Sequence, residues 1–184
     1  GIHFLLSVEV SNVYSQGGKL RKIHTILFAP TFEIAEQLNL KLSKIGKLTS
    51  DGRPTFGAAV KDIAKIVYDT STDCVLVPAH AWTPWFSIFG SNSGFDSIQE
   101  AFGEYSKHIF AIETGLSSDP PMNWRVSALD KVTLISNSDA HSAPKLGREA
   151  NVFDCEMDYY QIMEAIKKKD RKKFLYTVEF FPEE

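Results

Sequence analysis

The segment KVTLISNSDAHS, residues 131–142, joins a short apolar run to a polar run that contains two potential metal ligands. The apolar residues 131–135 are partly β-branched and are typical of a buried strand. Asp139 and His141 therefore lie where a strand ends, and two residues apart they can offer one carboxylate oxygen and one imidazole nitrogen to a divalent metal. Ser, Asn and Asp also favour a turn that simply terminates a strand, so both readings stay open.

The same arrangement recurs earlier in the chain. Residues 74–79 form a continuous apolar run that ends at His80, and residues 108–112 form another. Helical spacing of apolar residues predicts helices at 31–45 and 58–68, between the strands. Alternating strands and helices predict a parallel α/β architecture with a site at the carboxyl ends of the strands.

A predicted hairpin opens the chain, with strands at 4–10 and 22–28 and a turn near Gly17 and Gly18. Glu9 lies inside an otherwise apolar strand, and His24 has a similar setting. A buried carboxylate is costly unless it is paired or bound to a cation. For each residue alone a structural position is favoured, but the two together indicate a site.

The composition of the chain limits the classes of function that it can have. The chain has 184 residues, 43% of them hydrophobic, with a formal net charge of -3 and a pI near 6.0. Such a charge gives no bulk attraction for nucleic acid, so local features would have to hold that partner. Cys74 and Cys155 lie in or beside apolar runs, which indicates buried thiols and a cytoplasmic location. No apolar run reaches the roughly 20 residues that span a bilayer, so no membrane association is expected.

An irregular loop with five large aromatic residues follows His80, at 81–95. Its Gly, Ser and Pro content suits a loop that stacks on a substrate, and it suits equally a loop that buries its own aromatics. Arg53, beside Gly52 in a turn-rich segment, is a candidate phosphate contact or a surface ion-pairing residue. The basic run at 167–173 is typical of a solvated helix end, with nucleic-acid contact as the alternative.

Carboxylates and imidazoles without thiolates suit zinc, manganese, iron or magnesium in a hydrolytic site. The chain has neither a Gly-rich phosphate loop nor a G-x-S-x-G elbow. Metal-assisted phosphoester hydrolysis is therefore the predicted reaction class, with zinc as the first choice of divalent ion.

Several longer strings carry a more specific resemblance: SVEVS, KIHTILFAP, PAHAWTPW and SNSDAHS resemble the later metal-binding motifs of the PHP (polymerase and histidinol phosphatase) superfamily. DGRP, HAWTPWFSIFGSNSGFDSI, ETGLSSDPPMNW and KLGREANVF are similar to the endonuclease Q family within it. The resemblance implies a distorted seven-stranded β/α barrel, of which residues 1–178 would be the later part. Residues 179–184 would begin a linker to a C-terminal zinc region, and a His-x-His motif would precede residue 1.

The resemblance implies that the full-length parent is a metal-dependent endonuclease that nicks DNA on the 5′ side of deaminated bases, such as hypoxanthine and uracil, or of abasic sites, with a sliding clamp as a further partner. Whether residues 1–184 alone are active stays open. The implied metal ligands are Glu9, His24, His80, Asp139 and His141, of which Glu9, Asp139 and His141 would also be catalytic. The expected substrate contacts are Trp82, Trp85, Phe86, Phe89, Asn92, Ser93, Arg53, Arg125 and Arg148. A PHP-type phosphatase of small phosphoesters and a non-catalytic nucleic-acid-binding fragment are the alternatives.

Overall fold

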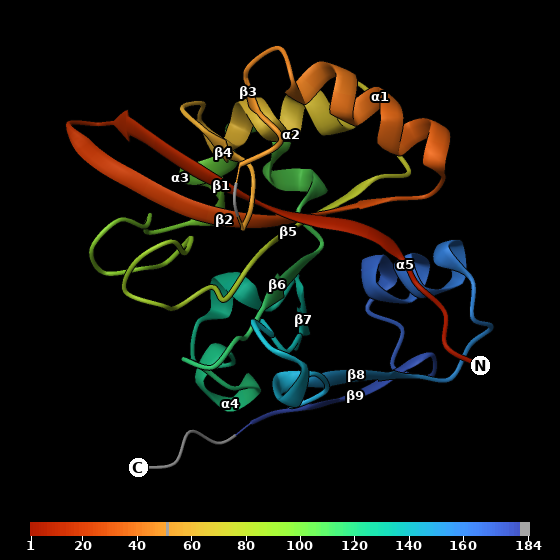
Figure 1. Ribbon diagram of the computed structural model, residues 1–184. Coiled ribbons are helices and arrows are strands. Elements are labelled where there is room, and N and C mark those ends of the chain that lie inside the picture. Colours follow the sequence, from red (N-terminus) through yellow and green to blue (C-terminus); the bar gives the residue numbers. More distant parts are fainter. Residues whose placement is uncertain (51, 181–184) are drawn as a thin grey trace.

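A five-stranded sheet with the order β3-β4-β1-β2-β5 organises the fold in the computed structural model, which describes residues 1–50 and 52–180 (Figure 1). Two-stranded sheets β6-β7 and β8-β9 accompany it. The strands are β1 (Leu6–Gln16), β2 (Lys19–Ala29), β3 (Gly46–Lys47), β4 (Thr55–Phe56), β5 (Val75–Pro78), β6 (Ala111–Glu113), β7 (Thr133–Ile135), β8 (Ala150–Phe153) and β9 (Phe174–Val178). The helices are α1 (Phe32–Leu42), α2 (Val60–Tyr68), α3 (Ile98–Phe102), α4 (Pro120–Asn123) and α5 (Tyr159–Lys168), with short 3-10 turns at Gly103–His108, Ser127–Leu129 and Ala143–Lys145.

The mixed α/β class is confirmed, but the expected parallel sheet is wrong. β1 pairs with β2, and β2 with β5, in antiparallel register, and parallel pairing occurs in β1-β4 and β6-β7. The predicted hairpin is present, with φ of 62° at Gly17 and 72° at Gly18, and the prediction fails at β5, which joins β2 in antiparallel register through long-range contacts. Within the described residues the sheets do not close into a barrel.

The two faces of the five-stranded sheet differ. Helices α1 and α2 cover one face, where Val10 of β1 and Ile23 of β2 join the larger core (Figure 1). The smaller core lies on the other side of β5, because Val75 and Val77 pack there with Met163 of α5. β5 is therefore buried on both faces, which explains its continuous apolar run.

Side-chain hydrogen bonds cap the start of two helices. Thr31 accepts a hydrogen bond from the Ile34 amide at the start of α1, and Asp158 accepts one from the Gln161 amide at the start of α5. Both cysteines are free, Cys74 buried and Cys155 partly so. Among the described residues no helix has the length and apolarity needed to cross a membrane. Of the predicted linker at 179–184, residues 181–184 lie outside the described part.

Candidate metal centre

Glu9 and His24 come from the middle of the two long strands, not from their ends. In the antiparallel register Glu9 lies opposite Ile26, and Ser11 lies opposite His24. Glu9 and His24 are thus diagonal neighbours on the same face of the hairpin. That face lies away from α1 and α2, because residues of alternate parity point to the opposite side of a strand.

His80 reaches the same place from the end of β5. The Ala79 amide donates to the carbonyl of His24 over 3.1 Å, and the Ala81 amide donates to that of Glu113 over 2.9 Å. The chain at His80 is therefore held between β2 and β6. His80 itself has a φ of 28°, which is strained for a residue with a Cβ and is typical of functional positions.

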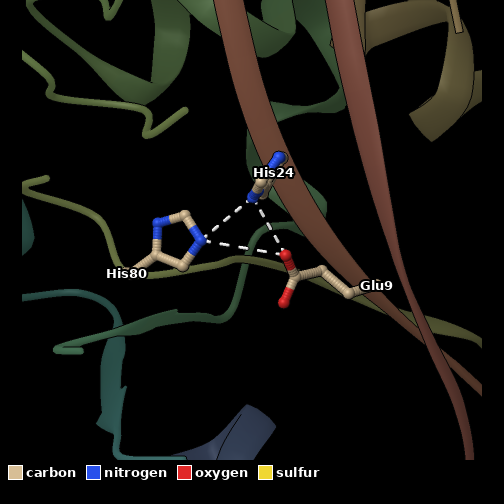
Figure 2. Close-up of side chains that lie close together, drawn as sticks. All are labelled: Glu9, His24 and His80. Atoms are coloured by element: carbon tan, nitrogen blue, oxygen red, sulfur yellow. Dashed lines mark hydrogen bonds and ion pairs between the residues drawn. The ribbon is translucent and has the colours of Figure 1, made fainter. Parts of the chain in front are cut away.

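The three side chains converge on one point (Figure 2). His24 Nδ1 lies 2.9 Å from Glu9 Oε1 and 3.1 Å from His80 Nε2, and His80 Nε2 lies 3.8 Å from Glu9 Oε1. Ligand atoms about 2.1 Å from a zinc ion in tetrahedral geometry lie about 3.4 Å apart, a value that the three separations bracket. Among the described residues, no hydrogen bond of normal geometry satisfies the buried Glu9 Oε1. These residues therefore fit a divalent cation.

The hydrogen-bond network directs lone pairs toward that point. The hydroxyl of Thr83 donates to the carbonyl of Trp85 over 2.7 Å, so its oxygen accepts from His80 Nδ1, 3.1 Å away, and His80 Nε2 keeps its lone pair. Arg53 Nη1 donates to His24 Nδ1 over 2.7 Å, so this nitrogen is also an acceptor. Three acceptor atoms face one another, and the Arg53 guanidinium, which also pairs with Glu9 Oε1, is the cation beside them.

Both imidazoles are held neutral. Burial lowers the pKa of His24 to about 4, with a further lowering by His80 and an opposing effect of Asp139. Burial also lowers the pKa of His80, against the raising effect of the Glu113 and Asp139 carboxylates. A metal ligand must be deprotonated, so at neutral pH both rings are in the form that binds a cation.

Asp139 and His141 lie beside this cluster but outside the group of three. They follow β7, and Asp139 has a φ of 43°, so it is strained like His80. His141 Nδ1 is 2.9 Å from the carbonyl of Asp139, and its Nε2 is 3.3 Å from Arg53 Nη2. Arg148 binds the same loop, donating from Nε to the carbonyl of Ser138 over 2.8 Å. Arg53 thus links the two halves of the predicted ligand set.

Glu113 is a site residue that is absent from the sequence-derived set. It is 2% exposed, accepts a 2.6 Å hydrogen bond from the His80 amide, and accepts another of 2.8 Å from Asn137 Nδ2. Burial raises the pKa of Glu113, while these two donors oppose the shift. The available signal was its position, because Glu113 ends β6 just as His80 follows β5.

The aromatic side chains of the loop differ in exposure, and two of them are partly buried against each other. Trp82 donates from Nε1 to Asn123 Oδ1 over 2.8 Å and packs on Phe89 with ring centroids 4.7 Å apart. Phe86 lies 4.7 Å from the His24 ring, and Trp85 is 46% exposed. Trp82 and Phe89 therefore pack within the loop, whereas stacking on a substrate stays a prediction for Trp85 and Phe86.

The remaining residues that are expected to contact the substrate also differ in their exposure to solvent. Asn92 is exposed, whereas Ser93 is 2% exposed and its hydroxyl donates to the carbonyl of Lys22 over 3.2 Å. In this conformation Ser93 supports the loop and does not face a substrate. Arg125 is exposed and, with Trp82, lines a cavity of about 350 Å³.

Comparison with known proteins gives related chains that are longer. Protein YqxK of Bacillus subtilis is 31% identical over 155 residues, which cover 83% of this chain and 38% of that protein. Protein MJ0043 of Methanocaldococcus jannaschii is 38% identical over 96 residues, covering 48% of this chain and 12% of that protein. Both relatives are described as uncharacterized. No protein-family model matches the chain.

Among solved structures, the lesion-specific endonuclease PfuEndoQ from Pyrococcus furiosus is similar, with a TM-score of 0.77 and 28% sequence identity. The match covers 93% of this chain and 40% of that one. This chain thus spans about two fifths of the solved structure and of the Bacillus subtilis relative. The likeness supports the predicted relation to endonuclease Q, while the PHP assignment and the barrel stay predictions.

Proposed function

We propose that this chain carries a metal centre of a DNA endonuclease that cuts a phosphodiester bond beside a damaged base. One observation carries the proposal most directly: Glu9, His24 and His80 present three acceptor atoms to one point in a chain that is similar to a lesion-specific endonuclease. Three protein ligands with a remaining open position are typical of catalytic zinc sites.

Bound there, a divalent cation would supply Lewis-acid chemistry to a phosphodiester. The residues of the chain would position the ligands and attract the substrate. Glu113 holds the backbone of His80, and therefore the direction of its ring, through the 2.6 Å hydrogen bond from the His80 amide. The guanidinium of Arg53 adds positive charge beside the cluster, where it would attract the phosphate of the substrate.

A base within a duplex has to leave the stack before a protein can inspect it. Trp85 and Phe86 are suited to stack on such a base, because Trp85 is accessible and Phe86 lies against His24. The proposed lesions are deaminated bases, hypoxanthine and uracil, and abasic sites, as the resemblance to endonuclease Q implies. Asp139 and His141 are proposed as further ligands or catalytic groups from the neighbouring loop.

The test is a nicking assay with the full-length protein and added Mn²⁺ or Zn²⁺, on an oligonucleotide with a single deoxyinosine. A nick on the 5′ side of the lesion is expected, with the undamaged oligonucleotide and p-nitrophenyl phosphate left intact. Asp139→Ala should abolish nicking while circular dichroism shows an unchanged fold. Asp69→Ala, which removes an exposed carboxylate paired with Lys65, is the matched control and should keep full activity.

Two results would contradict the proposal: nicking by Asp139→Ala at the wild-type rate, or absence of nicking by a full-length protein shown to hold its metal. Hydrolysis of p-nitrophenyl phosphate without nicking would instead favour the phosphatase alternative.

A further inference from the structure

A second feature with ligand-binding character lies away from the metal centre. A groove of about 620 Å³ runs between α4, β7 and β9, and its lining includes Trp124, Tyr176, Lys169, Arg171 and Asp130. None of the residues that line it belongs to the Glu9, His24 and His80 cluster. We call it the Trp124 groove. In Figure 1, α4 and β9 lie on the side of the molecule opposite to α1 and α2.

Two accessible aromatic side chains line the Trp124 groove. Trp124 is 69% exposed and Tyr176 is 58% exposed. Partly buried aromatics elsewhere pair with one another, as Trp82 does with Phe89, whereas the structure gives neither Trp124 nor Tyr176 an aromatic partner among the described residues. Their ring faces are therefore free to stack on a flat ligand.

The groove also lies at the most basic segment of an acidic chain. Residues 167–173 hold six of the chain's 20 lysines and arginines and one of its 23 acidic residues. Lys169 and Arg171 of this run line the groove, and among the described residues neither forms an ion pair with a carboxylate. Lys169 Nζ donates to the backbone carbonyl of Asp130 over 2.7 Å, which leaves its charge uncompensated.

We propose that the Trp124 groove binds a single-stranded segment of nucleic acid, with bases stacked on Trp124 and Tyr176 and phosphates placed at Lys169 and Arg171. Aromatic platforms beside cationic side chains are the usual means of holding single strands without sequence preference. A duplex hides the faces of its bases, so the free aromatic faces favour an unpaired strand. Among the described residues that line the groove, Asp130 carries the one carboxylate, against the two cationic side chains of Lys169 and Arg171.

The inference rests on the proposed function in so far as DNA is the substrate, because a strand held here would be the unpaired part of that DNA near the lesion. It also makes a separate prediction, because binding at the groove requires no metal.

The test is fluorescence anisotropy of a labelled 12-nucleotide single strand titrated with the purified chain in EDTA. Trp124→Ala and Tyr176→Ala should each weaken binding about fivefold or more, because each removes a stacking platform. Arg171→Ala should weaken binding less and should reduce its dependence on salt. Phe32→Ala, at an aromatic that is 71% exposed on α1, and Lys44→Ala, at an exposed lysine after α1, are the matched controls and should bind as the wild type does.

A strand that carries 5-iodouracil should in addition cross-link to Trp124 or Tyr176. Wild-type affinity of both aromatic variants, or a wild-type chain that does not bind the single strand, would overturn the proposal. The proposal would also be overturned if the chain bound a blunt duplex as tightly as the single strand and the same substitutions removed that binding. Tighter binding of an apolar peptide than of DNA would overturn it too. If the protein failed to nick DNA or to bind metal but still bound the single strand at the Trp124 groove, the proposed function would be contradicted and the inference about the groove would stand.

Discussion

Arg53 places one guanidinium against two acceptor atoms of the candidate metal centre. Its Nη1 atom lies beside Glu9 Oε1 and 2.7 Å from His24 Nδ1. Without this cation the three acceptor atoms would repel one another in a partly buried setting. Arg53 therefore stabilises the metal-free protein and competes with a divalent ion for the same electrostatic position.

Arg53→Met should separate these two effects. The metal-free variant should lose about 1–2 kcal/mol of unfolding free energy, because the Glu9 carboxylate is left without its charged partner. Zinc should stabilise the variant more than the wild type, because no competing cation has to be displaced. Thermal unfolding with and without zinc checks both signs, and equal zinc-induced shifts in the two proteins would contradict the role given to Arg53.

Gly115 sets the position of His80. It has a φ of 62°, and a Cβ added there would lie 2.6 Å from the Cβ and 2.8 Å from the Cα of His80. Only glycine fits this approach, since the nearest atoms belong to the backbone and the first side-chain carbon.

Gly115→Ala should displace His80 and weaken zinc binding about tenfold or more, in addition to the strain of about 1–2 kcal/mol at a positive φ. Gly103→Ala is the matched control, because Gly103 has a φ of 56° with open space around it. Isothermal titration with zinc should show weakened binding for Gly115→Ala alone. Similar zinc affinities in the two variants would mean that the backbone strain, not the contact with His80, explains any loss.

The three residues of the candidate cluster could be selected from the sequence because each is polar in an apolar strand or at its end. Glu9, His24 and His80 stand out in this way. Glu113 could not be separated from other strand-end residues, since its importance comes from the amide of His80, 33 positions away in the chain. The buried state of Ser93 was equally hidden, because it depends on a hydrogen bond to the carbonyl of Lys22.

At the level of elements, α5 holds the second core together. Met163 is 3% exposed and packs with Val75 and Val77 of β5, while Ala111 of β6 and Ile135 of β7 belong to the same cluster. The packing of α5 therefore keeps β5, β6 and β7 aligned, and with them the backbone that follows each strand. His80 and the loop at Asp139 depend on that alignment.

Met163→Ala should cost about 2–5 kcal/mol of unfolding free energy, the range for truncating a buried Met to Ala. Met157→Ala, at a methionine that is 68% exposed just before the same helix, should stay within about 0.5 kcal/mol of the wild type. Urea unfolding followed by circular dichroism gives both values. A small loss for Met163→Ala would mean that the second core contributes little.

Helices were easier to predict than strand pairing. α1 and α5 have side-chain caps and apolar spacing that act within a few residues, and α1 begins where the sequence predicts. Strand β9 is absent from the predicted elements, because it follows the basic run and has no fully buried residue to mark it. The direction of pairing between β2 and β5 depends on contacts about 50 residues apart, which periodicity does not encode.

At the scale of the whole molecule, the antiparallel sheet explains how the candidate centre is built. A hairpin brings Glu9 and His24 to one face, and the antiparallel β5 delivers His80 to the same face from the other side of β2. A purely parallel sheet would have gathered the ligands at strand ends, where the sequence predicts the site, whereas Glu9 and His24 lie within their strands. Asp139 and His141 do lie after a strand end and remain proposed partners of the three clustered residues.

The central claim is that Glu9, His24 and His80 hold one divalent cation, and metal analysis tests it directly. The purified chain, equilibrated with zinc and freed of excess ion by gel filtration, should retain about one zinc ion per chain. Glu9→Gln, His24→Ala and His80→Ala should each retain far less, while His3→Ala, at an exposed histidine outside the cluster, should match the wild type. A wild-type chain without bound zinc, or equal zinc contents in the wild type and all three cluster variants, would contradict the account.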